Sequence, residues 1–233
     1  MEVKEILSKC DHTLLAQTAT WKEIRAICDD GMKYGCASVC IPASYVKQAA
    51  EYVAGQIAVC TVIGFPNGYT PSGIKCMEAE SAVADGATEI DMVINLGWVK
   101  EGQYDKILQE INSVKISCHG NILKVIIETC LLTDEEKTAA CEASVRAGAA
   151  FVKTSTGFST GGATVHDVAL MKKAVKGQAK VKASGGIRMI DEAKKYLTLA
   201  QTVMGSGWIS PEHLRIGASS LLDNLLQTIK QGY

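Results

Sequence analysis

The sequence predicts an α/β protein, a single-domain (β/α)8 barrel, on three observations. The chain has 233 residues, of which 47% are hydrophobic, which is enough to bury the core of one such barrel. Short apolar stretches alternate with helix-like segments along its length, as in folds of parallel strands joined by helices. At five places a glycine stands five positions before a polar or reactive residue, across a short apolar stretch: Gly35 before Cys40, Gly55 before Cys60, Gly86 before Asp91, Gly148 before Lys153 and Gly177 before Lys182.

The strands follow from this spacing. Because glycine favours the conformation that ends a helix, each unit is expected to contain a helix end, a tight turn and a strand. We predict strands at residues 11–14, 37–41, 57–63, 89–94, 123–128, 151–154, 181–184 and 202–204. Eight strands alternating with helices fit a closed barrel better than an open doubly wound sheet. The GxGxxG fingerprint of a dinucleotide-binding fold does not follow the first strand.

The clearest predicted helix begins after Thr133. Thr133 and Glu136 have the spacing of a Thr-x-x-Glu capping box, and small apolar positions continue from there to Gly148. The chain contains four prolines, no low-complexity tract and no Pro/Ser-rich linker. Residues 1–233 are therefore predicted to form one domain.

Charge and hydropathy exclude several classes of partner. The formal net charge is -1, from 24 basic and 25 acidic residues that are interspersed, so no broad positive face for nucleic acid or for an anionic membrane is expected. The N-terminal segment is acidic where a secretory signal would be basic and then apolar, and no 18-residue uncharged apolar run occurs. We expect a cytoplasmic protein.

Cysteine and histidine usage argues against disulfides and metals. The nine cysteines are odd in number and scattered without a CxxC pair, which indicates reduced thiols that act as small core residues. The four histidines lie far apart and none has metal-ligand spacing to another His or Cys. No metal and no organic cofactor is expected.

Two lysines carry the chemical prediction. Lys153 and Lys182 each end an apolar strand and lead into a Thr/Ser/Gly-rich loop, on strands expected to be neighbours. A buried ammonium beside a second cation loses its proton more readily, and the resulting neutral amine attacks carbonyl groups. Asp91 ends another strand at the same offset and adds a proton carrier. The alternative is that each lysine extends its charge to water or pairs with a structural acid.

Two loops near the end of the chain predict a phosphate site. Gly185 and Gly186 follow the seventh strand, and residues 215–220, with Ser219 and Ser220, are placed after the eighth. Barrel enzymes often hold a phosphate on the loops after these strands. Alternatively, the glycines shape turns and Ser219 caps a helix. Thr156 and Gly157, after Lys153, supply a hydroxyl and a turn for other substrate oxygens.

Six segments together resemble the deoxyribose-phosphate aldolase family over essentially the whole chain. They are residues 11–15, 89–93, 123–129, 151–157, 182–188 and 217–220. The resemblance implies that Lys153 forms a Schiff base, that Lys182 tunes it and that Asp91 transfers a proton. It implies phosphate contacts and pocket positions for the following residues: Gly185, Gly186, Ser219 and Ser220 for the phosphate, and Asp11, Thr13, Cys40 and Thr156 for the pocket.

The implied reaction is reversible cleavage of 2-deoxy-D-ribose 5-phosphate to D-glyceraldehyde 3-phosphate and acetaldehyde, in deoxyribose phosphate catabolism. Barrels commonly associate through their helical faces, and the resemblance implies a homo-oligomer, either a dimer or a tetramer. Tyr233, the last residue, matches a C-terminal tyrosine of the family. Phe158 is a departure, since some members have lysine there, near the phosphate.

Two rival functions fit parts of the pattern. Another Schiff-base aldolase or a transaldolase would use the same amine chemistry on a different sugar phosphate. A non-catalytic barrel that senses sugar phosphates would keep the glycine and serine loops, but it would not need three ionisable groups.

Overall fold

The computed structural model describes residues 3–187, 189–204, 214–218 and 224. Within these residues, eight parallel strands close into a barrel in sequence order, with the first strand paired to the last. The strands are β1 (Cys10–Thr13), β2 (Ser38–Ile41), β3 (Ala58–Ile63), β4 (Glu89–Val93), β5 (Ile122–Ile126), β6 (Phe151–Lys153), β7 (Lys180–Ser184) and β8 (Leu214–Ala218). The predicted (β/α)8 barrel is confirmed.

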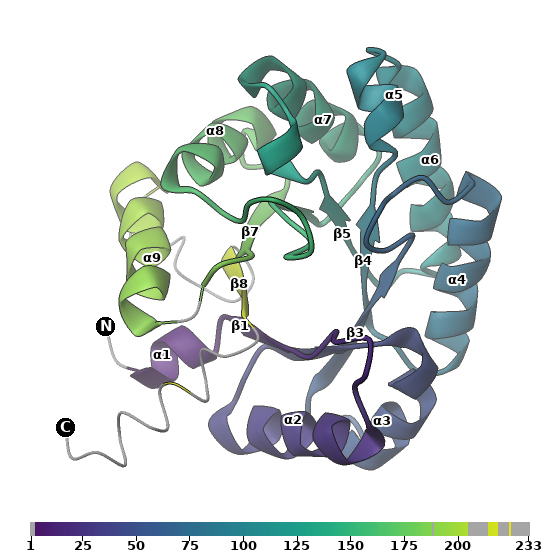
Figure 1. The fold of residues 1–233 in the computed structure, drawn as a ribbon, viewed down its shortest axis with the longest axis vertical. Helices are drawn as coiled ribbons and strands as arrows, with labels where there is room; N and C mark the ends of the chain where they lie inside the picture. The colour runs from purple at the N-terminus through teal and green to yellow at the C-terminus, as the bar shows by residue number, and fades with distance from the viewer. Residues whose placement is uncertain (1–2, 188, 205–213, 219–223, 225–233) are drawn as a thin grey trace.

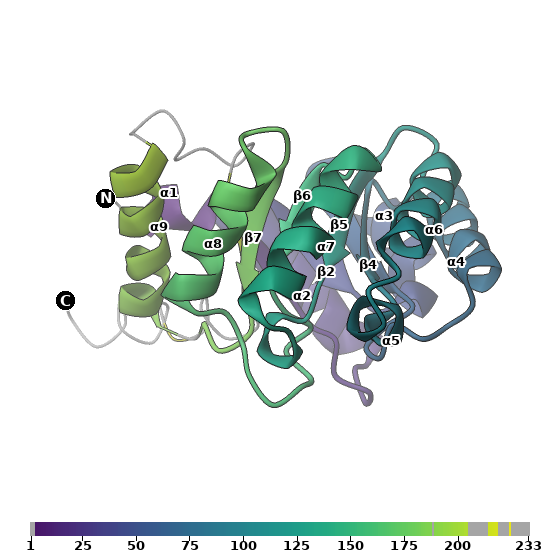
Figure 2. The same ribbon diagram turned by 90° about the horizontal axis from the view of Figure 1, so that it is seen from above.

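Helices surround the barrel as an outer ring (Figure 1). They are α1 (Val3–Leu7), α2 (Trp21–Tyr34), α3 (Val46–Val53), α4 (Ser72–Ala84), α5 (Leu96–Lys100), α6 (Tyr104–Ser117), α7 (Asp134–Arg146), α8 (Val165–Val175) and α9 (Ile190–Met204), with the 3-10 turns η1 (Ala43–Tyr45) and η2 (Thr129–Leu131). In side view, α7, α8 and α9 stand next to one another along the barrel wall (Figure 2). No helix in the described part of the chain has the length and apolar character needed to cross a membrane.

Local sequence explains the boundaries of these elements. Both hydrogen bonds of the predicted capping box join Thr133 and Glu136 at the start of α7. At the other end of a repeat, Gly35 closes α2 with φ 67°, and its N–H donates to the carbonyls of Gly31 and Met32. The other four glycines of the five-residue spacing also have positive φ. Residues with a Cβ rarely adopt this conformation, so the glycines end the helices and start the turns into the strands.

The eighth strand was predicted at the wrong place. Residues 202–204 lie at the end of α9, because the short β-branched and apolar run continues a 15-residue helix and does not begin a strand. The strand is Leu214–Ala218, most of which lies in the segment 215–220 that was expected to be a loop after the eighth strand. Arg215 is tolerated in this strand because carboxylates of β1 and β4 bind its guanidinium.

The two faces of the strands differ in chemistry. Ile90, Val152 and Val181 are fully buried and belong to the apolar core. Their sequence neighbours project to the opposite side, into the barrel, as strand geometry requires. These inward positions carry seven buried charged residues: Asp11, Glu89, Asp91, Lys124, Lys153, Lys182 and Arg215.

Candidate active site

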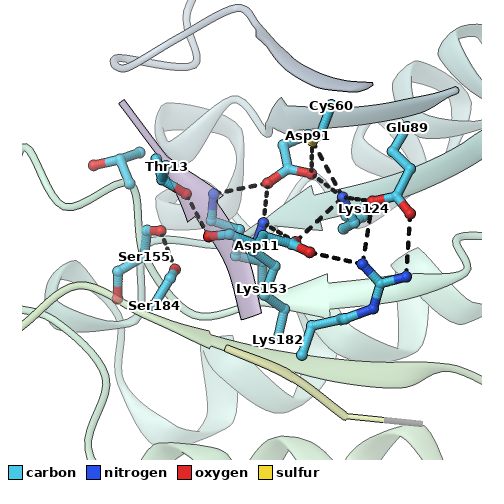
Figure 3. A network of polar contacts seen from close by, with 12 residues as sticks. Asp11, Thr13, Cys60, Glu89, Asp91, Lys124, Lys153, Ser155, Lys182 and Ser184 are labelled. Carbon is cyan, nitrogen blue, oxygen red and sulfur yellow. Dashed lines mark hydrogen bonds and ion pairs between the residues drawn. The ribbon is translucent and has the colours of Figure 1, made fainter. Parts of the chain in front are cut away.

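Asp91 lies at the centre of a buried charge network inside the barrel (Figure 3). Its Oδ2 accepts hydrogen bonds from Lys153 Nζ and Lys182 Nζ, both at 2.8 Å. Its Oδ1 accepts one from Lys124 Nζ at 2.8 Å. Lys153 and Lys182 meet at one oxygen because they are register partners on β6 and β7. The two lysines and the aspartate selected from the sequence are therefore brought together.

A second layer of ion pairs surrounds Lys182 and Lys124. Lys182 Nζ is 2.5 Å from Asp11 Oδ2, and the other oxygen of Asp11 accepts from Arg215 at 2.6 Å. Glu89 pairs with Lys124 at 2.6 Å and with Arg215 at 3.1 Å. Asp11 and Lys182 are 0% exposed, so these contacts take the place of water.

The mutual contacts fix the charge states of most of the network. Burial acts to raise the pKa of Asp91, but Lys124, Lys153 and Lys182 outweigh it and hold that pKa well below its ordinary value. Burial likewise opposes the ionised form of Asp11, and its cationic neighbours lower its pKa. Burial opposes the charge on Lys182 too, yet Asp11 and Asp91 raise the pKa of this lysine.

Counting charges singles out Lys153. The network holds three carboxylates, Asp11, Glu89 and Asp91, and four basic groups, Lys124, Lys153, Lys182 and Arg215. Each of the other three basic groups contacts at least two of the carboxylates, whereas Lys153 contacts Asp91 alone among the described residues. If all seven groups were ionised, one positive charge would be in excess in a medium that penalises it. Lys153 is the basic group of this network with the fewest carboxylate partners.

A cavity of about 350 Å³ opens above Lys153. Six predicted residues line it: Thr13, Lys153, Thr156, Gly157, Gly185 and Gly186. Asp11, Cys40, Asp91 and Lys182 are 0% exposed and lie beneath this lining. Ser219, Ser220 and Tyr233 lie outside the described residues. The structure thus places an amine at the boundary between a buried charge network and a space that admits a small molecule.

Phe158, the departure noted in the sequence, forms part of the cavity wall. Its side chain is 50% exposed and packs edge to face against Phe65 with ring centroids 5.3 Å apart. The cavity wall beside the loop that follows Lys153 is therefore apolar at the position where some members of the family that this chain resembles have a lysine.

Two groups of side chains have the donor types of a metal site. In the described part of the chain, donor atoms lie within 4.8 Å of one another in Cys40–Cys60–Asp91 and in Asp134–His166–Asp167. In the first, lysine ammonium groups bind both Asp91 oxygens. In the second, Lys137 lies 3.0 Å from Asp134 and 2.6 Å from Asp167. A metal ion would have to displace a lysine at either place.

The network also contains three residues that the sequence did not single out: Lys124, Glu89 and Arg215. Lys124 carried a usable signal, because it interrupts an apolar strand as Lys153 and Lys182 do. Glu89 and Arg215 have no comparable signal in the sequence, because their partners come from strands on distant parts of the chain.

Comparison with known proteins identifies the family. The profile of the DeoC/LacD family aldolases matches residues 6–227. The chain belongs to this aldolase family. Among family members, the deoxyribose-phosphate aldolase of Streptococcus pyogenes serotype M2 is 56% identical over 209 residues, which is 90% of this chain and 94% of that protein.

Solved structures of related aldolases agree with the barrel. The aldolase QR15 is 35% identical with a TM-score of 0.86, and the match covers 98% of this chain and 99% of that one. The deoxyribose phosphate aldolase of Aeropyrum pernix, described as having a unique tetrameric structure, is 30% identical with a TM-score of 0.82. That match covers 97% of this chain and 92% of that one. The structural match to these aldolases extends over almost the whole chain.

Proposed function

We propose that this aldolase cleaves 2-deoxy-D-ribose 5-phosphate reversibly to D-glyceraldehyde 3-phosphate and acetaldehyde, through a Schiff base on Lys153, in deoxyribose phosphate catabolism. The observation that carries the proposal is the position of Lys153, the excess cation of the network at the edge of the cavity. The substrate is inferred from the related deoxyribose-phosphate aldolases of Streptococcus pyogenes and Aeropyrum pernix.

The first step is attack of the neutral Lys153 amine on the aldehyde carbon of the open-chain sugar. Loss of water from the carbinolamine gives an iminium ion, which withdraws electrons from the neighbouring C2–C3 bond. Lys182 remains an ammonium ion, because Asp11 and Asp91 both bind it. Its positive charge disfavours reprotonation of the amine beside it.

The second step is cleavage of the C2–C3 bond with loss of the C3 hydroxyl proton. When Lys153 turns to the substrate, Asp91 Oδ2 loses one of its two donors and gains room for one water. We assign to Asp91 the proton transfer through that water. Glyceraldehyde 3-phosphate leaves, and the enamine is protonated at carbon and hydrolysed to acetaldehyde and free Lys153.

The phosphate is proposed to lie at the turn after β7. Gly185 and Gly186 have φ 83° and 79°, and this conformation leaves backbone N–H groups free of side-chain cover at the cavity wall. Ser219 and Ser220 are also assigned to the substrate phosphate, by the resemblance alone. Because Phe158 supplies no charge, we expect a weaker preference for phosphorylated over unphosphorylated aldehydes than a lysine there would give.

Borohydride trapping tests the reaction. Incubation with 2-deoxy-D-ribose 5-phosphate and borohydride should leave a stable adduct on Lys153, located by peptide mass mapping. Absence of the adduct in active protein contradicts the covalent step. Release of acetaldehyde supports the proposed substrate, whereas transfer of a dihydroxyacetone unit would assign a transaldolase.

We further propose that residues 1–233 form one aldolase domain, and that the protein is cytoplasmic and self-associates. Nine free cysteines support a reducing compartment, and the tetrameric description of the Aeropyrum pernix relative supports self-association. Light scattering after size exclusion should give a mass above the 24.8 kDa of one chain. A monomer at micromolar concentration contradicts this expectation.

A further inference from the structure

Glu128 is a buried carboxylate beside the cavity, and the mechanism above does not use it. Its side chain is 2% exposed, and no lysine or arginine of the described residues lies within 4.0 Å of it. Its backbone has φ 50° and ψ 65° at the turn after β5, a left-handed conformation that disfavours residues other than glycine. Strained positions of this kind persist where the surrounding contacts require them, and they often mark functional sites.

Most of the hydrogen bonds to the Glu128 carboxylate come from one residue, Thr156, in the loop that follows Lys153. Cys130 Sγ adds a longer contact of 4.0 Å. Thr156 donates both its backbone N–H and its hydroxyl to the Glu128 carboxylate. The hydroxyl in turn accepts a hydrogen bond from Phe158 N at 3.0 Å. The turns are also tied through the backbone, since Thr129 N donates to Thr154 O at 2.9 Å.

These bonds determine what Thr156 can offer to a substrate. A hydroxyl has one proton to donate and two lone pairs that accept. Glu128 takes the proton and Phe158 takes one lone pair, so one acceptor and no donor remain for the cavity that Thr156 lines. Without Glu128, the hydroxyl could rotate and donate instead.

We propose that Glu128 is a positioning residue that fixes the direction of the Thr156 hydroxyl, so that the pocket accepts a substrate hydroxyl there and rejects a group that only accepts hydrogen bonds. This inference rests on the proposed function. The loop that follows Lys153 runs toward the turn at Gly185, which Gly157 approaches. Thr156, one residue before Gly157, therefore lies between Lys153 and this turn. The selected hydroxyl is therefore the one between the reacting carbon and the phosphate.

The test compares two acceptor aldehydes in condensation with acetaldehyde. One is D-glyceraldehyde 3-phosphate, and the other carries fluorine in place of its 2-hydroxyl, which is similar in size and cannot donate. The discrimination ratio is kcat/KM for D-glyceraldehyde 3-phosphate divided by kcat/KM for the fluorinated aldehyde. The intrinsic reactivity of the two aldehydes cancels when this ratio is compared between enzyme variants.

Glu128→Gln should lower this ratio by roughly 10- to 100-fold, the range typical of a hydrogen bond to a charged group. The amide oxygen can accept from Thr156 N, which leaves the amide NH2 to donate to the hydroxyl and turns its proton toward the cavity. Thr156→Val should also lower the ratio, and Thr156→Ser should preserve it. Glu135→Gln, at an exposed position of α7, is the matched control and should leave the ratio unchanged.

The double variant Glu128→Gln/Thr156→Val separates this role from general support of the fold. If Glu128 acts through Thr156, the double variant has the ratio of Thr156→Val alone. Additive losses, or an unchanged ratio in Glu128→Gln, overturn the proposal. If Glu128→Gln does not fold, an unchanged ratio in Thr156→Val overturns it equally.

Failure of this inference is distinguishable from failure of the reaction. Glu128→Gln keeps Lys153, so the borohydride adduct with deoxyribose 5-phosphate should still form in it. An adduct with unchanged discrimination rejects only the role of Glu128. No adduct in the unaltered protein rejects the proposed reaction itself.

Discussion

Two buried lysines of this barrel, Lys75 and Lys153, are both paired with a carboxylate and yet have opposite surroundings. Lys75 Nζ donates to Gly68 O at 2.6 Å, Val93 O at 2.8 Å and Glu110 Oε1 at 2.9 Å, which uses all three protons of an ammonium group. Lys153 Nζ has one such bond among the described residues, to Asp91, and borders the cavity.

The difference shows that burial alone does not mark a reactive lysine. At Lys75 every donor is satisfied, and Glu110 receives further bonds from Ser72 and from Asn95 N, so the pair is a structural clamp between α4, β4 and α6. At Lys153 the surrounding network has more cations than carboxylates and the amine has space beside it. An excess of positive charge and N–H donors without partners, next to a cavity, are the features that mark a lysine as a candidate for reaction with a substrate.

The sharpest test of this comparison is Lys153→Met. We expect activity to fall at least roughly 10⁴-fold, as when a nucleophile is removed. The melting temperature should change by less than about 5 °C, because the charge network keeps its other pairs. Residual activity above one per cent would show that another amine reacts.

Lys75→Met should produce the opposite pattern. Glu110 would become an uncompensated buried charge, which typically costs about 3–5 kcal/mol of the free energy of unfolding. For a chain of this size, this corresponds to a fall of roughly 6–20 °C in melting temperature. Activity per folded molecule should fall far less than in Lys153→Met. Lys47→Met, at an exposed site on α3, is the control, and equal melting temperatures for the two variants would contradict the clamp.

Lys182→Leu should shift the pH profile of the reaction. Removing this cation leaves three carboxylates facing Lys124, Lys153 and Arg215, so that the proton on Lys153 is needed for charge balance. The acidic limb of kcat/KM should move to higher pH by about 1–2 units, so that activity at any pH on that limb falls roughly 10- to 100-fold. If the acidic limb stays at the same pH and kcat/KM is lower at every pH, Lys182 does not act on the proton of Lys153.

The smallest expected effect is on stability in acid. The pKa values of Asp11 and Asp91 are lowered in the folded protein, so their ionised forms stabilise it fully above the unfolded pKa of about 3.9. This contribution is lost progressively as the pH falls below that value. Asp11→Asn should flatten the fall of melting temperature between pH 5 and pH 3, while exposed Asp105→Asn should not. Parallel curves for the two variants would contradict this linkage.

Much of the fold and the centre of the site could be predicted because their signals are local. The glycine that ends each helix and the polar residue five positions later lie on one short segment, and the spacing places Asp91, Lys153 and Lys182 on β4, β6 and β7. Lys153 is the last residue of its strand, as predicted, whereas Asp91 and Lys182 lie in the middle of theirs. All three meet inside the barrel. The position of each follows from the repeat that contains it.

The remainder depends on contacts that closure of the barrel creates. Arg215 resembles a loop residue until Asp11 and Glu89 are brought beside it, 204 and 126 positions away in the chain. The buried position of Lys75 could not be predicted for the same reason, because its partner Glu110 comes from another helix. Glu128 lay inside a segment quoted for its resemblance, but its bonds to Thr156 depend on a backbone conformation that its sequence does not suggest.

Pairing of the first strand with the last has a consequence for synthesis of the enzyme. A ribosome that has made residues 1–213 has not yet supplied Leu214–Ala218, so β1 and β7 would be open edges and Asp11 would lack Arg215. The three carboxylates would then face only three cations, and the excess of positive charge in the network would be absent. The cation excess around Lys153, on which the proposed chemistry depends, is therefore established only when the last strand of the barrel has been translated and has paired with β1 and β7.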